Sequence, residues 1–150
     1  MVTARLKWDS LFNPNEERVR VAFIKFCGMG TGGTEKVMQT IAANLDKNKF
    51  LVDFYYCDTA TYIGSDYIHP DNEFDRMVYC YSNGVRLIKF YVKHKDLRVH
   101  THDWVDTDFW EIFDESRYDV IQTGRAGHPE YPFTKIHNTP IVDSIHLAGM

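Results

Sequence analysis

Hydrophobic positions along the chain follow two patterns, one typical of strands and one typical of helices, which alternate. Short runs of Val, Ile, Phe and Tyr are typical of buried strands, and between them apolar residues recur at the spacing of an amphipathic helix. The predicted strands cover residues 18–27, 50–57, 85–92, 118–123 and 140–145. The predicted helices cover residues 35–45, 74–81, 104–116 and 130–137. Thr34 is the predicted N-cap of the first helix.

The alternation of strands with helices predicts an α/β fold. We expect a Rossmann-like, doubly wound parallel sheet with helices on both faces and right-handed crossovers. Ligands of such folds bind beyond the carboxyl ends of the strands. Residues 1–17 are expected to form a leader, with a short helical turn around Trp8 to Phe12. The segments expected to share the carboxyl rim of the sheet are 28–34, 58–66, 124–128 and 146–149.

A glycine-rich segment, with the sequence C-G-M-G-T-G-G-T-E, lies between the first strand and the first helix and covers residues 27–35. Its glycines are more numerous than a strand-to-helix turn requires. A strand, a glycine loop and a helix together present backbone N–H groups and the positive end of the helix to an anion. Glu35 also suits a helix N-terminus by its charge alone. The residues predicted to bind phosphate or substrate here are Gly30, Thr31, Gly32, Gly33 and Glu35.

Part of the same segment also satisfies a dinucleotide-binding fingerprint. The spacing Gly28-x-Gly30-x-x-Gly33 fits that pattern, and Asp58 closes the second strand, where a ribose-binding acid would stand. Asp53 has the right distance in sequence from the glycines but lies inside the strand. Thr40 stands where the fingerprint expects an apolar residue, so this interpretation accounts for fewer residues.

Three motifs together resemble the N-terminal domain of retaining glycosyltransferases with the GT-B fold, glycosyl transferase family four. The first is Gly32-Gly33-Thr34-Glu35, followed by an Ile-Ala-x-x-Leu pattern at 41–45. The sequences Y-D-V-I-Q-T-G at 118–124 and P-I-V-D-S-I-H at 140–146 are similar to two later strands of that family. The resemblance runs from residue 18 to residue 150. It departs from the family at 122–125, where Q-T-G-R replaces an end that usually contains histidine.

The resemblance implies a function for the domain at 18–150. It would be the acceptor-side half of an enzyme that transfers a sugar from a nucleotide-sugar, with retention, to a glycan, lipid or small-molecule acceptor. The family needs no metal for this reaction, and we expect no cofactor. The donor-binding C-terminal half, with its paired glutamates, is not found in this sequence, so we expect a fragment that is inactive alone. His146 is the residue that the resemblance implies at the reaction centre.

Two further residues on the expected rim are candidates for binding phosphate or substrate. Arg125 follows a predicted strand and suits bidentate pairing with phosphate, although an ion pair with Glu130 would also explain it. His128 lies in the same loop. His100 and His102 have poor spacing for a metal site and no evident third ligand, so no metal is predicted.

Composition narrows the class of protein. A net charge of −4 argues against nucleic-acid binding, and no apolar run is long enough to span a membrane. The three cysteines, odd in number and set in apolar runs, indicate reduced thiols and a cytoplasmic protein. The alternatives to a glycosyltransferase are a nucleotide- or NAD-binding domain of an oxidoreductase and a non-catalytic interaction module.

Overall fold

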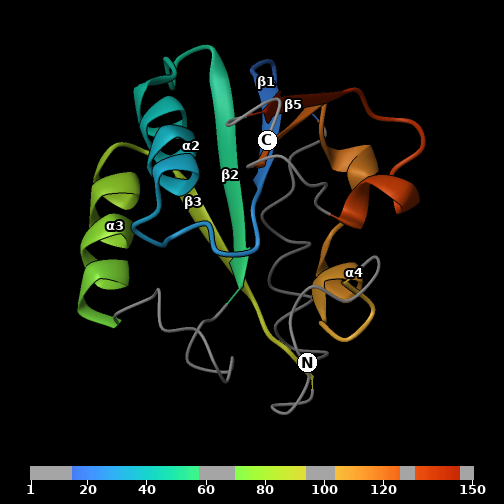
Figure 1. The fold of residues 1–150 in the computed structure, drawn as a ribbon. Coiled ribbons are helices and arrows are strands. Elements are labelled where there is room, and N and C mark those ends of the chain that lie inside the picture. Colours follow the sequence, from blue (N-terminus) through green and yellow to red (C-terminus); the bar gives the residue numbers. More distant parts are fainter. Residues whose placement is uncertain (1–14, 58–69, 94–103, 126–130, 146–150) are drawn as a thin grey trace.

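A five-stranded parallel sheet forms the centre of the molecule, with strand order β3-β2-β1-β4-β5 (Figure 1). The computed structural model describes residues 15–57, 70–93, 104–125 and 131–145. The sheet confirms the predicted α/β, Rossmann-like fold, and β1 is its central strand. The strands are β1 (Val19–Ile24), β2 (Phe50–Cys57), β3 (Arg86–Phe90), β4 (Val120–Arg125) and β5 (Ile141–Ile145).

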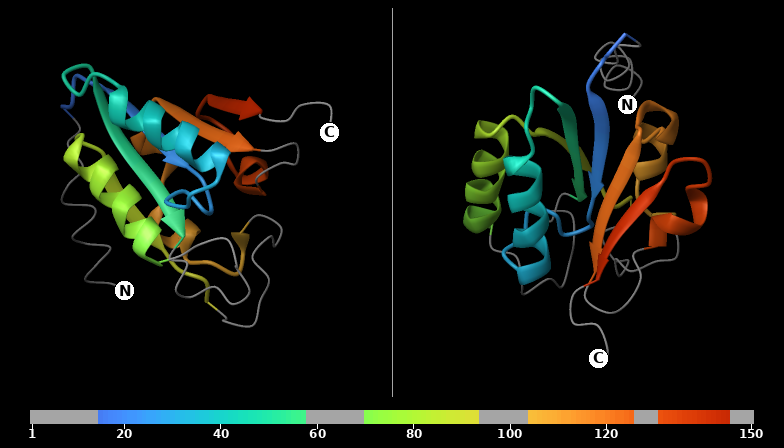
Figure 2. Two further views of the ribbon diagram at one scale, coloured as in Figure 1. Left: turned by 60° about the vertical axis from the view of Figure 1, so that its left-hand side comes forward. Right: turned by 90° about the horizontal axis from the view of Figure 1, so that it is seen from above.

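Helical segments cover both faces of the sheet. Two long helices, α2 (Gly33–Asn44) and α3 (Pro70–Ser82), lie side by side on one face, as Figure 2 shows. Three short segments cover the other face: α4 (Phe109–Ile112), η3 (Glu115–Arg117) and η4 (Tyr131–Lys135). Helices therefore cover both faces as predicted, with the two long ones on one face and short segments on the other.

Both faces of the sheet are buried, which explains why the strands are nearly continuous apolar runs in the sequence. In β1, Val21 and Phe23 pack under α2 and α3, while Ala22 and Ile24 pack on the opposite face. The opposite face is strongly aromatic. Its rings pack edge to face or stacked, with centroid separations such as 5.1 Å between Phe90 and Trp104. The other rings of this cluster are those of Phe26, Tyr55, Phe109, Phe113 and Tyr118.

The predicted helix over 104–116 is wrong. Trp104 has φ of 54°, and only Phe109–Ile112 is α-helical. Polar side chains here bond to the backbone and so compete with a helix. The Thr107 hydroxyl accepts from the Phe109 N–H at 3.2 Å, and the Asp108 carboxylate accepts from the Tyr91 N–H at 2.7 Å. The helix predicted over 130–137 is likewise only the 3-10 segment η4.

Several predicted boundaries also need correction. Strand β1 ends at Ile24 rather than residue 27, because the chain turns at Lys25, whose carbonyl accepts from the Gly28 N–H at 3.0 Å. The N-cap of α2 is Gly32, not Thr34, and it gives no side-chain cap. Helix α3 begins at Pro70, four residues before the predicted start at 74. Gly124 and Arg125 belong to β4 rather than to a loop.

Helix α3 is predicted by the helical spacing of Phe74, Met77, Val78 and Tyr81, of which Met77 packs against the core. Phe74, Val78 and Tyr81 are exposed, with 64%, 46% and 74% of their surface accessible. Cys80 of this helix belongs to the core cluster beneath α2 and α3, and Glu73 is also buried. The helix was predicted correctly, although most of the apolar residues that predict it are exposed.

Candidate functional site

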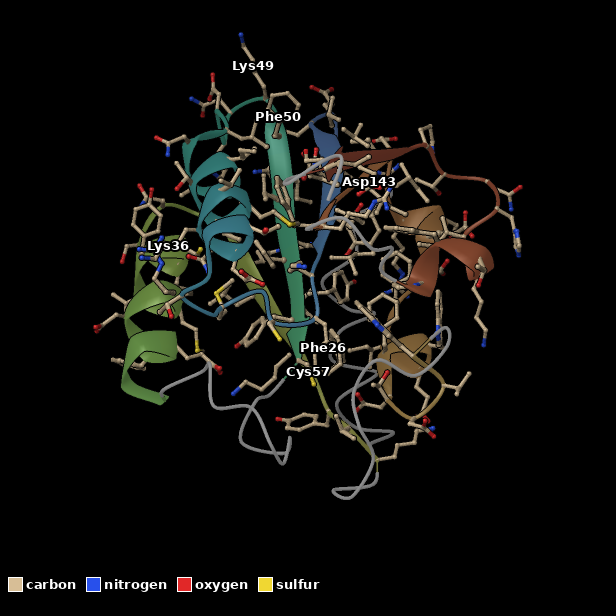
Figure 3. All side chains as sticks on the ribbon, viewed as in Figure 1. Phe26, Lys36, Lys49, Phe50, Cys57 and Asp143 are labelled. Carbon is tan, nitrogen blue, oxygen red and sulfur yellow. The ribbon has the colours of Figure 1, made fainter. Side chains whose placement is uncertain are left out.

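The glycine-rich segment occupies the carboxyl edge of the sheet, as predicted. It follows the end of β1 and leads into α2, and we call residues 25–32 the glycine loop. Figure 3 shows Phe26 and Cys57 at this end of the sheet, with Lys49 and Phe50 at the opposite end. A hydrogen bond of 2.9 Å from the Cys57 N–H to the Phe26 carbonyl joins the beginning of the loop to the end of β2.

The glycines of this region have different physical roles. A Cβ on Gly28 would stand 2.5 Å from Cε1 of Phe54 and 3.0 Å from the Lys25 carbonyl oxygen, so Gly28 lets the loop pack on β2. A Cβ on Gly33 would meet nothing within 4 Å. Gly32 and Gly33 are both exposed. Packing therefore requires glycine at Gly28, whereas Gly33 has room that no described residue fills.

Backbone N–H groups at the start of α2 are available to a ligand. The N–H groups of Thr31, Gly32, Gly33 and Thr34 donate to no acceptor among the residues that the structure describes. Helix geometry leaves the first N–H groups of α2 without intrahelical partners, and Gly32 has no side chain to cap them. Together with the positive end of the helix, this arrangement suits a phosphate or a carboxylate.

The Glu35 carboxylate lies over this same stretch. A Cβ on Gly32 would collide with Glu35 Oε2, so the side chain folds back against the loop. Its Oε1 is 4.0 Å from the Nζ of Lys25, which is buried. The carboxylate thus balances a buried lysine beside the helix N-terminus. An anion that binds at Gly32 would have to pass or displace this side chain.

Arg125 reaches the same rim through the packing of β4 on α2. A Cβ on Gly124 would lie 2.7 Å from the sulfur of Met38 and 3.4 Å from Cγ2 of Thr34, so only glycine lets β4 approach the first turns of α2 this closely. Arg125 donates through Nε to Oδ2 of Asp143 at 2.6 Å. Its described partner is therefore on β5, and Glu130 lies outside the described residues.

Sequence reasoning did not identify Asp143, Gln39 or Arg76 as functional residues. Asp143 accepts from Arg125 and, at 3.1 Å, from the Thr123 hydroxyl. Gln39 is fully buried on α2 and bonds to the glycine loop and to Arg76 of α3. The one available signal is that Gln39 is polar and adjoins Met38 in the stripe of α2 that faces the sheet.

Other predicted site residues lie outside the described residues. They are His128 and His146, together with the rim segments 58–66 and 146–149 and the pair His100 and His102. Within the described ranges no group of three or more His, Cys, Asp or Glu side chains could hold a metal ion. None of the described helices is long and apolar enough to cross a bilayer. No disulfide joins Cys27, Cys57 and Cys80, all of which are described.

Of the residues that suggest dinucleotide binding, Asp53 and the glycines can be compared with the structure, whereas Asp58 lies outside the described residues. Asp53 is buried in β2 and pairs with Arg86 through two oxygens, at 2.5 and 2.9 Å. It also accepts from the Tyr118 hydroxyl at 2.7 Å, which in turn is 2.5 Å from the Tyr55 hydroxyl. Burial raises the pKa of both tyrosines, and the charge of Asp53 acts in the same direction. The Asp53 carboxylate is thus occupied by bonds within the core. Gly33 does not make the close helix–strand contact that the third glycine of the fingerprint provides.

Comparison of this chain with protein-family models, with curated proteins and with solved structures finds no match. The assignment of function therefore depends on the motifs and on the geometry of the glycine loop.

Proposed function

We propose that this chain is the N-terminal, acceptor-side half of a retaining GT-B glycosyltransferase. The observation that carries the proposal is the exposed Gly32-Gly33 pair at the start of α2, within Gly-Gly-x-Glu, on the carboxyl rim of the sheet. The later motifs of the resemblance supply β4 and β5, whose carboxyl ends share that rim. A β-α-β sheet with this order is the framework that such a domain requires.

The loop would act on the leaving group. In sugar transfer the bond between the anomeric carbon and a phosphate oxygen breaks, and its electron pair leaves with the nucleoside diphosphate. The acceptor oxygen bonds to the anomeric carbon on the same face, and its proton passes to the departing phosphate. Backbone N–H groups at Gly32 and Gly33 would stabilise the charge that develops on the diphosphate, without a metal ion. His146 remains the candidate for the reaction centre, and Arg125 for a phosphate contact.

Amide NMR of the 150-residue chain tests the proposal. Titration with UDP-glucose and GDP-mannose should shift the amide signals of residues 31–34, with a Kd on the order of 1 mM because one half of the site is present. NAD provides the comparison with the dinucleotide alternative. Tighter binding of NAD than of both nucleotide-sugars, or no shift at 31–34 with either sugar nucleotide, would contradict the proposal. The same chain should transfer no sugar by itself.

A further inference from the structure

The side chain of Gln39 is fully buried between α2 and the glycine loop. Its Nε2 donates to the carbonyl oxygen of Gly28 at 2.7 Å and to that of Gly30 at 2.9 Å. Both hydrogens of one amide are therefore used on two carbonyls of the same loop. Without these donors both carbonyl groups, which belong to buried residues, would lose a hydrogen bond that a folded protein normally provides.

Arg76 on α3 determines which way this amide points. Its Nε donates to Oε1 of Gln39, and its guanidinium lies over the ring of Tyr79, 4.6 Å from the centroid. A guanidinium only donates hydrogen bonds, so it must face the oxygen of the amide. The opposite amide orientation would set the Oε1 atom against two carbonyl oxygens and the NH₂ group against the arginine.

The bonds to Gln39 also determine where the loop's N–H groups point. A trans peptide unit is planar, with its C=O and N–H on opposite sides. Because the Gly30 carbonyl points toward Gln39, the N–H of Thr31 points away from it. The same holds for the Gly28 carbonyl and the N–H of Met29. The carbonyl that points toward Gln39 and the N–H that points away from it therefore belong to the same peptide unit in each case.

From this geometry we propose that Gln39 is a positioning residue for the glycine loop, and that Arg76 holds its amide in the productive direction. The pair turns loop N–H groups toward the rim and connects that orientation to α3 through the bond between Arg76 and Gln39. The consequence for ligand affinity rests on the proposed function. The effect on loop conformation does not.

The first test replaces the donor while it keeps the size of the side chain. Gln39→Glu removes the N–H groups but leaves a carboxylate that Arg76 can bind. We expect large shifts and faster exchange of the amide signals of residues 29–33, and at least tenfold weaker binding of UDP-glucose. Acidification should return the loop signals partway, because a protonated carboxyl has one O–H to donate. Asn48→Asp, an exposed amide-to-carboxylate change beyond the end of α2, is the matched control and should leave these signals unchanged.

The second test acts through Arg76. Arg76→Met leaves Oε1 of Gln39 without its donor, so the side-chain NH₂ signals of Gln39 and the loop amides should both shift, and Arg76→Lys should restore part of the change. This variant also decides the question if Gln39→Glu does not fold. Loop signals that match wild type in folded Gln39→Glu, or in Arg76→Met, would overturn the proposal. Shifted loop signals in a protein that never binds UDP-glucose would support it and refute the glycosyltransferase assignment instead.

Discussion

Arg125 and Asp143 form an ion pair across β4 and β5, with 2.6 Å between Nε and Oδ2 and about a quarter of each side chain exposed. Breaking a pair this accessible should cost about 0.5–1 kcal/mol of unfolding free energy. The effect on ligand binding should differ in sign between the partners. Asp143→Asn leaves the guanidinium charge unbalanced and should bind UDP-glucose severalfold more tightly, whereas Arg125→Gln should bind it more weakly.

Urea unfolding and the NMR titration measure these two effects. Arg20→Gln is the control, because it breaks an exposed ion pair with Asp119 at the amino edge of the sheet. Equal affinities for UDP-glucose in wild type, Asp143→Asn and Arg125→Gln would assign Arg125 a structural role only.

Gly28 and Gly33 provide a matched pair of substitutions in one region. Gly28→Ala forces a methyl group against Phe54 and should destabilise the protein by about 1–3 kcal/mol. Gly33→Ala has open space and should move the Tm by only a few degrees. In the two-domain enzyme that we propose, Gly33→Ala should nonetheless lower turnover about a hundredfold, which corresponds to about 3 kcal/mol.

Thermal unfolding of both variants and turnover of the intact enzyme check this contrast. Near-normal turnover of Gly33→Ala would remove that glycine from the mechanism. A Gly33→Ala chain that does not fold would mean that glycine serves backbone conformation or packing there.

Asp53 should be among the costliest polar residues to replace. Asp53→Asn weakens the bonds from Arg86 and from the Tyr118 hydroxyl in a buried network. We expect a loss of about 3 kcal/mol, at the low end for buried ion pairs, because 34% of the Arg86 side chain is exposed. Urea unfolding at neutral pH gives the value, with Asp119→Asn as the exposed comparison. Similar losses in the two variants would disprove the importance of burial here.

Glu115 should make stability depend on pH at the acid end. Partial burial acts to raise the pKa of Glu115, but the backbone N–H groups of His137, Asn138 and Thr139 outweigh it and hold the pKa below the ordinary 4.5. A lowered carboxyl pKa stabilises the fold above the ordinary value, and this contribution disappears as the pH falls through the folded-state pKa.

Glu115→Gln should therefore lower the Tm by a few degrees at pH 7 and by progressively less below about pH 4.5. Melting curves between pH 7 and pH 3 test the trend, and Glu17→Gln removes an exposed carboxyl as a control. A difference between Glu115→Gln and wild type that stays constant over this range would contradict the assignment.

The sheet was predictable because burial on both faces makes each strand apolar, and because alternation with helices leaves few ways to connect parallel strands. The irregular structure over 104–116 was not predictable, because the hydrogen bonds of Thr107 and Asp108 to the backbone depend on contacts formed after folding. Periodicity located α3, although Phe74 and Tyr81, two of the residues that give the period, are exposed.

The candidate site was predictable only where it follows from local sequence. The glycine loop could be recognised because glycine spacing and a following helix are continuous in the chain. The partners of Arg125 and Gln39 could not be recognised in this way. Asp143 contacts Arg125 through strand register, and Arg76 contacts Gln39 through helix packing. Such pairs have no signature in a single sequence.

The central place of β1 has a consequence for synthesis of the protein. Val21 lies opposite Val52 on one side and opposite Val120 on the other. One edge of β1 therefore stays unpaired until β4 has been synthesised, about 100 residues later. At typical elongation rates that interval is roughly 5–20 s. During it, an open strand edge and the uncovered side chains of Ala22 and Ile24 can pair with another nascent chain. Expression yield should therefore respond strongly to chaperones that shield the emerging β1.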